Sequence, residues 1–292
     1  MLAIKTILAP VDFSDRSEQV ALHAAELARV FDARLLLLYV RPSELYPALA
    51  PMDVVLPVDI HKEEEARAAQ LLGEMATRIA PQGRIDCLVR EGDPATVIGH
   101  VASENSVDLL VMPTHGRGMF RRFLLGSVAS KTLHDTTLPV LTGVHLDEAP
   151  AFGGAESYRT VACAVGLGDH DHARKVLAEA NDWAKVLGAQ LHVLHCPSAG
   201  ELAAWEGVPV ETPQEVERRR RDTLTDMLAK LEIEADVHVS MGNPVDTVMR
   251  SVEALDADLL VVGRSVRSSL LDRPHGDGYA FIRESPVPVL SI

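Results

Sequence analysis

Short apolar runs alternate with helix-like patterns along the first half of the chain. The run from Arg34 to Val40 is apolar at nearly every position, which indicates a strand with both faces buried. From about residue 16 to 30, apolar residues instead recur with the 3.6-residue period of a helix. The pattern predicts strands at 4–11, 34–40, 85–89, 107–112 and 138–142, and helices at about 16–30, 61–79, 94–105 and 127–135. Strands that alternate with helices in this way predict parallel β–α units.

Polar residues mark where the predicted helices begin. Asp15 is expected to be the N-cap of the first helix, with Glu18 three residues later completing a capping box. Asp93 is expected to cap the third helix, with Pro94 in its first position. Residues 43–60 contain three prolines and are predicted to form a loop before the charged second helix.

The same order of elements begins again in the second half of the chain. Five segments of the first half have counterparts there, in the same order: 7–11 in 161–165, 33–40 in 189–196, 91–94 in 241–244, 108–112 in 258–262 and 138–141 in 287–290. This internal repeat predicts two domains, 1–146 and 158–292, joined by a linker at 147–157. Each domain is expected to be α/β, with a parallel sheet of about five strands and helices on both faces.

A glycine-bearing loop joins the predicted fourth strand to the helix at 127–135. Gly116 and Gly126 let the main chain approach a ligand closely, and Ser127 is expected to be the N-cap of the helix. The N–H groups at a helix start attract anions, and open parallel sheets bind ligands beyond the carboxyl ends of their strands. Three arginines add positive charge to the loop: Arg117, Arg121 and Arg122. The sequence therefore indicates an anion cradle for phosphate groups; the alternative is a glycine-rich connection without a ligand.

Composition limits the classes of protein to which the chain can belong. Hydrophobic residues make up 47% and charged residues 24% of the 292 residues, as in ordinary globular proteins. The net charge of −14 argues against binding to nucleic acids or to anionic membranes. No apolar run reaches the roughly 18 residues that a membrane span needs. Cys87, Cys163 and Cys196 are expected to be buried, reduced thiols, and the protein is expected to be cytoplasmic.

Other candidate chemistry in the sequence is weaker. Residues 169–172, Asp-His-Asp-His, carry metal-binding side chains, but a polar helix N-terminus is the favoured interpretation and no metal site is expected. His192 and His195 lie three apart on a predicted strand, so they point to opposite faces and cannot chelate one ion together. The sequence has no nucleophile elbow and no phosphate-loop Gly-Lys-Ser/Thr, so no catalytic residue is assigned. The arginine run at 218–221 is interpreted as a solvated helix face.

Together these segments resemble the universal stress protein family over nearly the whole chain, as two tandem copies. ATP-binding members of that family carry Gly-x2-Gly-x9-Gly-Ser/Thr after the fourth strand and an Asp at the end of the first strand. Gly116, Gly126 and Ser127 match the last three positions of this motif, and Pro113 stands in place of its first glycine. Asp12 matches the family's acid. Because proline removes one backbone donor, weakened or unchanged binding is expected.

The resemblance implies Rossmann-like domains of the adenine-nucleotide α-hydrolase type, with ATP, with or without Mg²⁺, bound in the first. A carboxylate such as Asp12 can accept hydrogen bonds from ribose hydroxyls or an adenine amine; the alternative is a turn or capping acid. His115 could touch phosphate or be an ordinary loop imidazole. The site implied by the resemblance consists of Pro10, Val11, Asp12, Val40, Met112, Pro113, His115, Gly116, Arg117, Gly126, Ser127 and Val128.

The second copy departs from the family's motif. Three replacements separate it from the first copy: Gly166 for Asp12, Val266 for Gly116 and Asp277 for Ser127. A carboxylate at position 277 would repel phosphate oxygens, by roughly 1–4 kcal/mol for charges about 4 Å apart near a protein surface. The branched side chain at position 266 adds bulk where the main chain would have to approach a ligand. The second copy is therefore not expected to bind ATP.

The sequence thus predicts an ATP-binding stress-response protein that acts as a sensor or regulator, with one nucleotide per chain. Two alternatives remain open: slow ATP hydrolysis at the same loop, and a scaffold or a binder of other ligands with vestigial sites. The resemblance also implies that the last strands of the two copies, around Val140 and Val289, pair across a pseudo-twofold axis. That arrangement would be a dimer within one chain, and a homodimer of whole chains is a further expectation.

Overall fold

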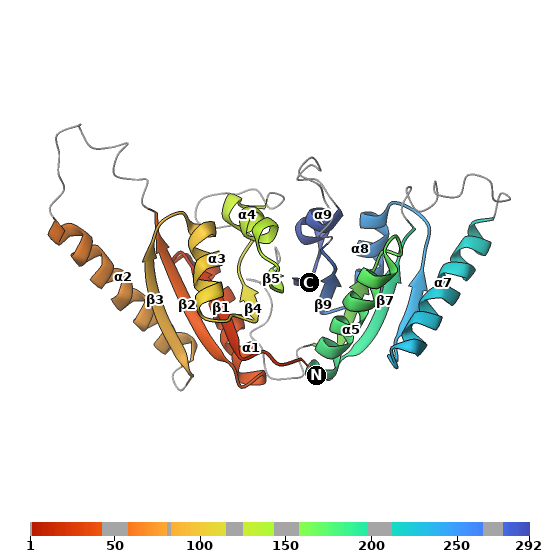
Figure 1. The fold of residues 1–292 in the computed structure, drawn as a ribbon, viewed down its shortest axis with the longest axis horizontal. Coiled ribbons are helices and arrows are strands. Elements are labelled where there is room, and N and C mark those ends of the chain that lie inside the picture. Colours follow the sequence, from red (N-terminus) through yellow and green to blue (C-terminus); the bar gives the residue numbers. More distant parts are fainter. Residues whose placement is uncertain are drawn as a thin grey trace. The chain divides into compact units, whose positions relative to one another are not determined.

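A computed structural model describes residues 2–42, 58–80, 83–114, 125–142, 158–197, 212–264 and 277–292 (Figure 1). The chain folds into two compact units, one made mainly of residues 3–141 and the other mainly of residues 153–292. Both are α/β, as the alternation of apolar runs and helical patterns predicts.

The first unit contains five parallel strands in the order β3-β2-β1-β4-β5. Its elements are β1 (Thr6–Val11), α1 (Asp15–Val30), β2 (Arg34–Arg41), α2 (Val58–Ile79), β3 (Ile85–Glu91), α3 (Pro94–Glu104), β4 (Leu109–Val111), α4 (Ser127–Asp135) and β5 (Val140–Thr142) (Figure 1). Leu35 to Leu38 in β2 each expose 1% of their surface or less. Successive strand residues point to opposite faces, so both faces of the sheet are covered there.

The second unit repeats this topology in the strand order β10-β9-β6-β7-β8, again with parallel neighbours. Its elements are β6 (Thr160–Ala164), α5 (His170–Leu187), β7 (Gln190–His195), α7 (Pro213–Lys230), β8 (Asp236–Val239), α8 (Pro244–Ala254), β9 (Leu259–Val262), α9 (Asp277–Glu284) and β10 (Val289–Ser291) (Figure 1). The arginine run at 218–221 lies on α7, as expected for a charged helix. The internal repeat in the sequence is therefore a repeat of structure.

An aspartate fixes the beginning of the central strand in both units. In the first unit, the Asp108 carboxylate accepts hydrogen bonds from the Lys5 and Thr6 amides at 2.7 and 3.0 Å. In the second, Asp258 accepts from the amides of residues 159 and 160 at 2.7 and 2.9 Å. These amides precede or begin the strand, so the carboxylate satisfies donors that the sheet leaves unpaired.

The first helix begins differently from the prediction. Its N-cap is Ser14, whose hydroxyl accepts from the Ser17 amide at 3.2 Å, and Asp15 is already helical. The Glu18 carboxylate turns away from the helix start and accepts two hydrogen bonds from Arg78 of α2, at 2.7 and 3.0 Å. The predicted capping box of Asp15 and Glu18 is therefore wrong, because a tertiary ion pair holds the glutamate.

Other predicted boundaries differ by a few residues. Asp93 caps α3 with Pro94 at its start, as predicted. The helix expected from residue 61 begins at Val58 (α2), and the strand expected at 107–112 covers only Leu109–Val111 (β4). The rest of the predicted proline-rich loop, 43–57, and the predicted linker lie outside the described residues.

The cysteines are free, but only one of them is buried as expected. Cys163 in β6 is fully covered, whereas Cys87 is exposed and Cys196 is intermediate. Cys87 lies on β3, the outermost strand of its unit, whose residues are all intermediate or exposed. The sequence shows an apolar run there but not its place at the edge of the sheet.

Candidate functional site

The order of the strands places a candidate site beyond β1 and β4. From β1 the chain continues to β2 and β3 on one side, and it later returns to β4 and β5 on the other. Such a reversal opens a crevice at the carboxyl ends of the two neighbouring strands, and open α/β sheets bind ligands there. Pro10 and Val11 end β1, and Met112 and Pro113 follow β4 directly. The structure thus brings these two pairs of predicted site residues to the same edge.

Asp12 organises the turn between β1 and α1. Its Oδ1 atom accepts hydrogen bonds from the Ser14 amide at 3.0 Å and from the Ser14 hydroxyl at 2.5 Å. Its own amide donates to the Ser17 hydroxyl at 3.3 Å, and that hydroxyl donates to the Ser14 carbonyl at 3.0 Å. The carboxylate therefore has a fixed orientation just beyond the carboxyl end of β1. The turn role, one of the two readings of this residue, is confirmed.

The residue after Asp12 has a strained main chain. Phe13 has φ = 59°, in the left-handed region that bulky residues rarely adopt. Its ring packs against Tyr39 of β2, with centroids 4.5 Å apart and planes inclined by 39°. Strained residues of this kind cost about 1–3 kcal/mol and cluster at ligand sites. Phe13 and Tyr39 were not predicted from the sequence; Val40, which was, follows Tyr39 and is buried.

The loop after β4 has ends that are tied together. The Gly126 amide donates to the Thr114 carbonyl at 2.8 Å, so these two residues, twelve apart in sequence, lie side by side. Met112 and Thr114 expose only 4% and 2% of their surface, which anchors the outgoing end. His115, Gly116 and Arg117, predicted for the site, lie outside the described residues, within the segment 115–124.

The helix after the loop has no side-chain cap. Gly126, not the predicted Ser127, is the N-cap of α4, and Ser127 is the first helical residue. The Gly126 carbonyl accepts from the Ser130 amide at 2.8 Å, as an N-cap carbonyl does, but glycine has no side-chain oxygen to offer the first turn. Elsewhere in the described parts of the chain, side chains cap five helices: Ser14, Asp93, Asp169, Thr212 and Asn243. The amides that begin at Ser127 and Val128 are thus suited to an anion.

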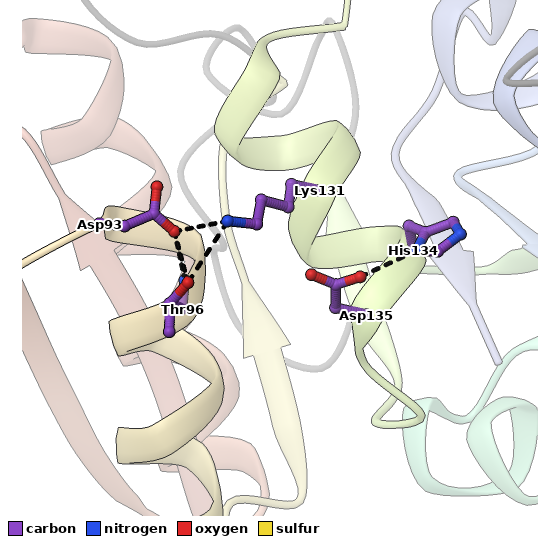
Figure 2. Close-up of polar contacts among 5 residues, drawn as sticks. All are labelled: Asp93, Thr96, Lys131, His134 and Asp135. Carbon is purple, nitrogen blue, oxygen red and sulfur yellow. Dashed lines mark hydrogen bonds and ion pairs between the residues drawn. The ribbon is translucent and has the colours of Figure 1, made fainter.

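A polar contact connects α4 to the neighbouring helix (Figure 2). Lys131 lies one turn after Ser127, and its ammonium donates to the Asp93 carboxylate at 2.7 Å and approaches the Thr96 hydroxyl at 3.3 Å. Asp93 also caps α3 through the Thr96 amide at 3.0 Å. The hydrogen bond from the Lys131 ammonium, more than those from Thr96, lowers the pKa of Asp93 to about 2. The carboxylate therefore stays charged and helps to orient α4.

The corresponding edge of the second unit is built differently. Gly166, which replaces the acid, follows β6, and Asp169 caps α5 by accepting from the amides of residues 171 and 172. A Cβ atom on Gly263, just after β9, would lie 2.7 Å from Nε2 of His172 and 2.5 Å from Val176. The His172 ring thus packs directly on the main chain where a ligand would approach. Val266 and Gly276 lie outside the described residues.

The histidines that the sequence analysis singled out lie at a helix start and on a strand of the second unit. Asp169 is a helix cap, as the polar helix N-terminus predicts, and no group of three or more His, Cys, Asp or Glu side chains in the described residues is arranged to hold a metal. His195 donates from Nδ1 to the Val165 carbonyl at 2.8 Å, whereas Nδ1 of His192 lies 3.1 Å from Nε2 of His238. The two strand histidines therefore have separate partners. The pairing of His192 with His238 needs the strand register and was not predicted.

Fold and site together define a protein of two tandem Rossmann-like domains, the first with a loop and helix start suited to an anion. The sequence model of the universal stress protein family matches residues 3–142 and again 157–292, so the chain belongs to that family. No described helix has both the length and the low polarity needed to cross a bilayer.

Individual relatives agree with this assignment. A universal stress protein of Methanocaldococcus jannaschii is 34% identical over 140 residues, which are 47% of this chain and 80% of that protein. One from Thermus aquaticus is 33% identical over 138 residues, 47% of this chain and 96% of its own. The crystal structure of a universal stress protein from Archaeoglobus fulgidus superposes with a TM-score of 0.70 at 22% identity, covering 98% of this chain and 97% of that one. That likeness shows the tandem fold.

Proposed function

We propose that the chain is an ATP-binding regulator of a stress response that holds one adenine nucleotide in its first unit. The observation that carries the proposal is the start of α4, where Gly126 supplies no side-chain cap beside a loop closed by the Thr114–Gly126 hydrogen bond. Its position beyond β1 and β4 supports the same conclusion, because ligands of open parallel sheets bind there.

The proposal gives each predicted site residue a role. The amides at the start of α4, with the Ser127 hydroxyl, would hold phosphate oxygens. Asp12 would accept hydrogen bonds from the ribose, and Val40, Met112 and Val128 would contact the base. Further contacts to the phosphates, with or without Mg²⁺, would come from His115, Gly116 and Arg117, and Pro10, Val11 and Pro113 would shape the surrounding main chain. The bound nucleotide supplies the signal, and this chain supplies binding and orientation.

The proposal assigns no nucleotide to the second unit. The His172 ring and Val176 pack on Gly263, which leaves no room there for even one added carbon atom without a shift. Gly166 offers no carboxylate in the place of Asp12. The expected stoichiometry is therefore one nucleotide per chain.

The first test is titration calorimetry with ATP and Mg²⁺ on the Gly126→Val variant. Gly126 has φ = −63° and ψ = 152°, which valine tolerates, so the fold should persist while the branched side chain covers the approach to the amides. The expected result is affinity at least about tenfold weaker than in the wild-type protein. The matched control is Gly276→Val, the counterpart in the second copy, which should bind like the wild type. Equal binding by Gly126→Val, or no heat and no thermal shift with the wild-type protein, would contradict the proposal.

Asp12→Asn separates the turn role of this residue from its ligand role. Asparagine retains an Oδ1 acceptor for Ser14, so the turn should remain, but the charge that favours ribose hydroxyl donors is lost. Weaker ATP binding at unchanged melting temperature is expected. Slow hydrolysis at the same loop is the alternative activity, and phosphate release that is steady in the wild type and abolished in Asp12→Ala would favour it over a purely regulatory role.

Domain limits and assembly belong to the same proposal. We take 1–146 and 158–292 as the domains and 147–157 as their linker, which limited proteolysis should cleave first.

The resemblance to single-copy relatives supports pairing of the last strands near Val140 and Val289, and a disulfide formed between cysteines placed there would test it. Sedimentation of the whole chain distinguishes a 31.7-kDa monomer from a homodimer. The free thiols support a cytoplasmic location.

A further inference from the structure

One difference between the two units is a pair of histidines in the outer two strands of the second unit, at positions that leucines occupy in the first. In the first unit, β2 and β3 pair with Leu36 opposite Asp86 and Leu38 opposite Leu88. In the second unit, β7 and β8 pair with His192 opposite Asp236 and Leu194 opposite His238. His192 and His238 thus occupy the places of two leucines, Leu36 and Leu88.

The polar residues at the edge of this strand pair have equivalent partners in the two units. Arg34 forms an ion pair with Asp86 in the first unit, and Gln190 donates to Asp236 at 2.9 Å in the second. The acid is therefore common to both units, whereas the imidazoles belong to the second alone. Because leucines occupy the equivalent positions in the first unit, a sheet of this topology can form without the two histidines.

The two imidazoles face each other at short range. Nδ1 of His192 lies 3.1 Å from Nε2 of His238, and the ring centroids are 5.3 Å apart. His192 exposes 8% of its surface and is nearly enclosed, so its nitrogen is held in place by packing. Oδ2 of Asp236 lies 3.8 Å from the same nitrogen of His192. Two nitrogens and a carboxylate oxygen thus come together on one face of the sheet.

These distances are close to those of a metal chelate. Zinc bonds to imidazole nitrogen at about 2.0–2.1 Å, so two ligand nitrogens in a tetrahedral site lie roughly 3.3 Å apart. Imidazole and carboxylate ligands favour Zn²⁺, Cu²⁺ or Ni²⁺ over Mg²⁺ or Ca²⁺. The ion can enter from solvent, because β8 is the last strand in its unit's sheet order and the Asp236 side chain is 61% exposed.

We propose that His192 and His238 bind a divalent transition-metal ion of the zinc type, with Asp236 and water as the remaining ligands. The two imidazoles form the fixed part of the site, and Asp236 joins them by a side-chain rotation away from Gln190. The site is thus a two-histidine chelate that is completed only on binding, because the described residues contain no group of three or more ligands already arranged around an ion. The Arg221 guanidinium, whose charge acts on His238, donates to the Val237 carbonyl at 2.6 Å.

The test is calorimetric titration of the untagged, metal-stripped whole chain with Zn²⁺. One ion per chain should bind to the wild-type protein, and His192→Leu/His238→Leu should lose that site. The double variant restores the residues of the first unit at these two positions, so it should fold with undiminished melting temperature. His100→Gln and His134→Gln, both at exposed positions outside the strand pair, serve as controls for adventitious binding and should bind like the wild type.

Two further measurements test the proposed metal site. Asp236→Asn removes the proposed third ligand and should weaken Zn²⁺ binding by at least about tenfold, since the loss of even an outer-shell carboxylate costs that much. Co²⁺ should give a visible absorption band in the wild type that the double leucine variant lacks. If the wild type binds no ion, or if the double variant binds Zn²⁺ with unchanged affinity, the pair is only a hydrogen bond between two rings and the metal site does not exist.

Discussion

A buried histidine in α1 gives the first unit a dependence on pH. His23 exposes 5% of its surface and faces the core together with Val20, Leu27 and several alanines of the same helix. Burial lowers the pKa of His23 to about 3, because the interior disfavours the charged ring. The unfolded chain takes up a proton near pH 6.5, whereas the folded chain does not. Stability from this residue is therefore complete above that pH and is lost progressively as the pH falls towards 3.

The prediction for His23 concerns urea unfolding at pH 7 and pH 5. One pKa unit corresponds to about 1.4 kcal/mol, so this residue should lower the free energy of unfolding by about 2 kcal/mol between the two pH values. His23→Leu cannot be protonated and should show a correspondingly smaller loss on acidification. His100→Gln, exposed on α3, should lose as much as the wild type. An identical loss in wild type and His23→Leu would show that the ring is not kept neutral in the fold.

Individual site residues differ in how far the sequence defines them. Asp12 could be found from its place after an apolar strand, and its turn role follows from the preference of aspartate for such turns. The left-handed Phe13 beside it could not, because nothing in a phenylalanine indicates positive φ. The sequence correctly placed the start of the helix at Ser127. It wrongly made Ser127 the N-cap, which is Gly126. Any residue with extended main chain can cap a helix, and a serine next to a glycine leaves the choice open.

At the scale of elements, the turn before α3 and its repeat before α8 share one unusual conformation. Gly92 has φ = 145° and Gly242 has φ = 149°, values that side chains rarely adopt. A Cβ atom would lie 2.9 Å from Val97 at the first position and 2.7 Å from the Thr247 hydroxyl at the second. Each glycine is followed by a capping residue and a proline that begins the helix. The repeated Gly-Asp/Asn-Pro sequence thus has a main-chain cause.

Alanine at these positions should therefore be destabilising. Gly92→Ala and Gly242→Ala are each expected to lower the free energy of unfolding by about 1–3 kcal/mol through strain and contact. Gly99 in α3 is the matched control, because an added Cβ meets nothing within 4 Å and alanine favours helix. Gly99→Ala should stabilise by about 0.5–1 kcal/mol. Thermal and urea unfolding of the three variants measures these free energies. Unchanged stability of Gly92→Ala would show that the positive φ and the close approach to Val97 do not disfavour a side chain there.

For the whole molecule, the sequence predicted the α/β class, the parallel sheets and the duplication, because periodicity and repetition survive in every strand and helix. It predicted less well what depends on position within the sheet. Cys87 looks buried in an apolar run, but β3 is an outer strand and the thiol is exposed. His192 meets His238 across a strand register that no local pattern reveals. The order of strands and helices can be read from the sequence, whereas the neighbours of each strand in the sheet are set only when the chain folds.

The hydrogen bond between Thr114 and Gly126 has a consequence for how such proteins diversify. When a hydrogen bond joins the two ends of a segment, residues can be added to it or removed from it at little cost in stability, since the entropy of loop closure changes only slowly with length. Its composition can vary while the strand before it and the helix after it keep their places. Sequence change between these two anchors can thus accumulate separately from the stability of the scaffold.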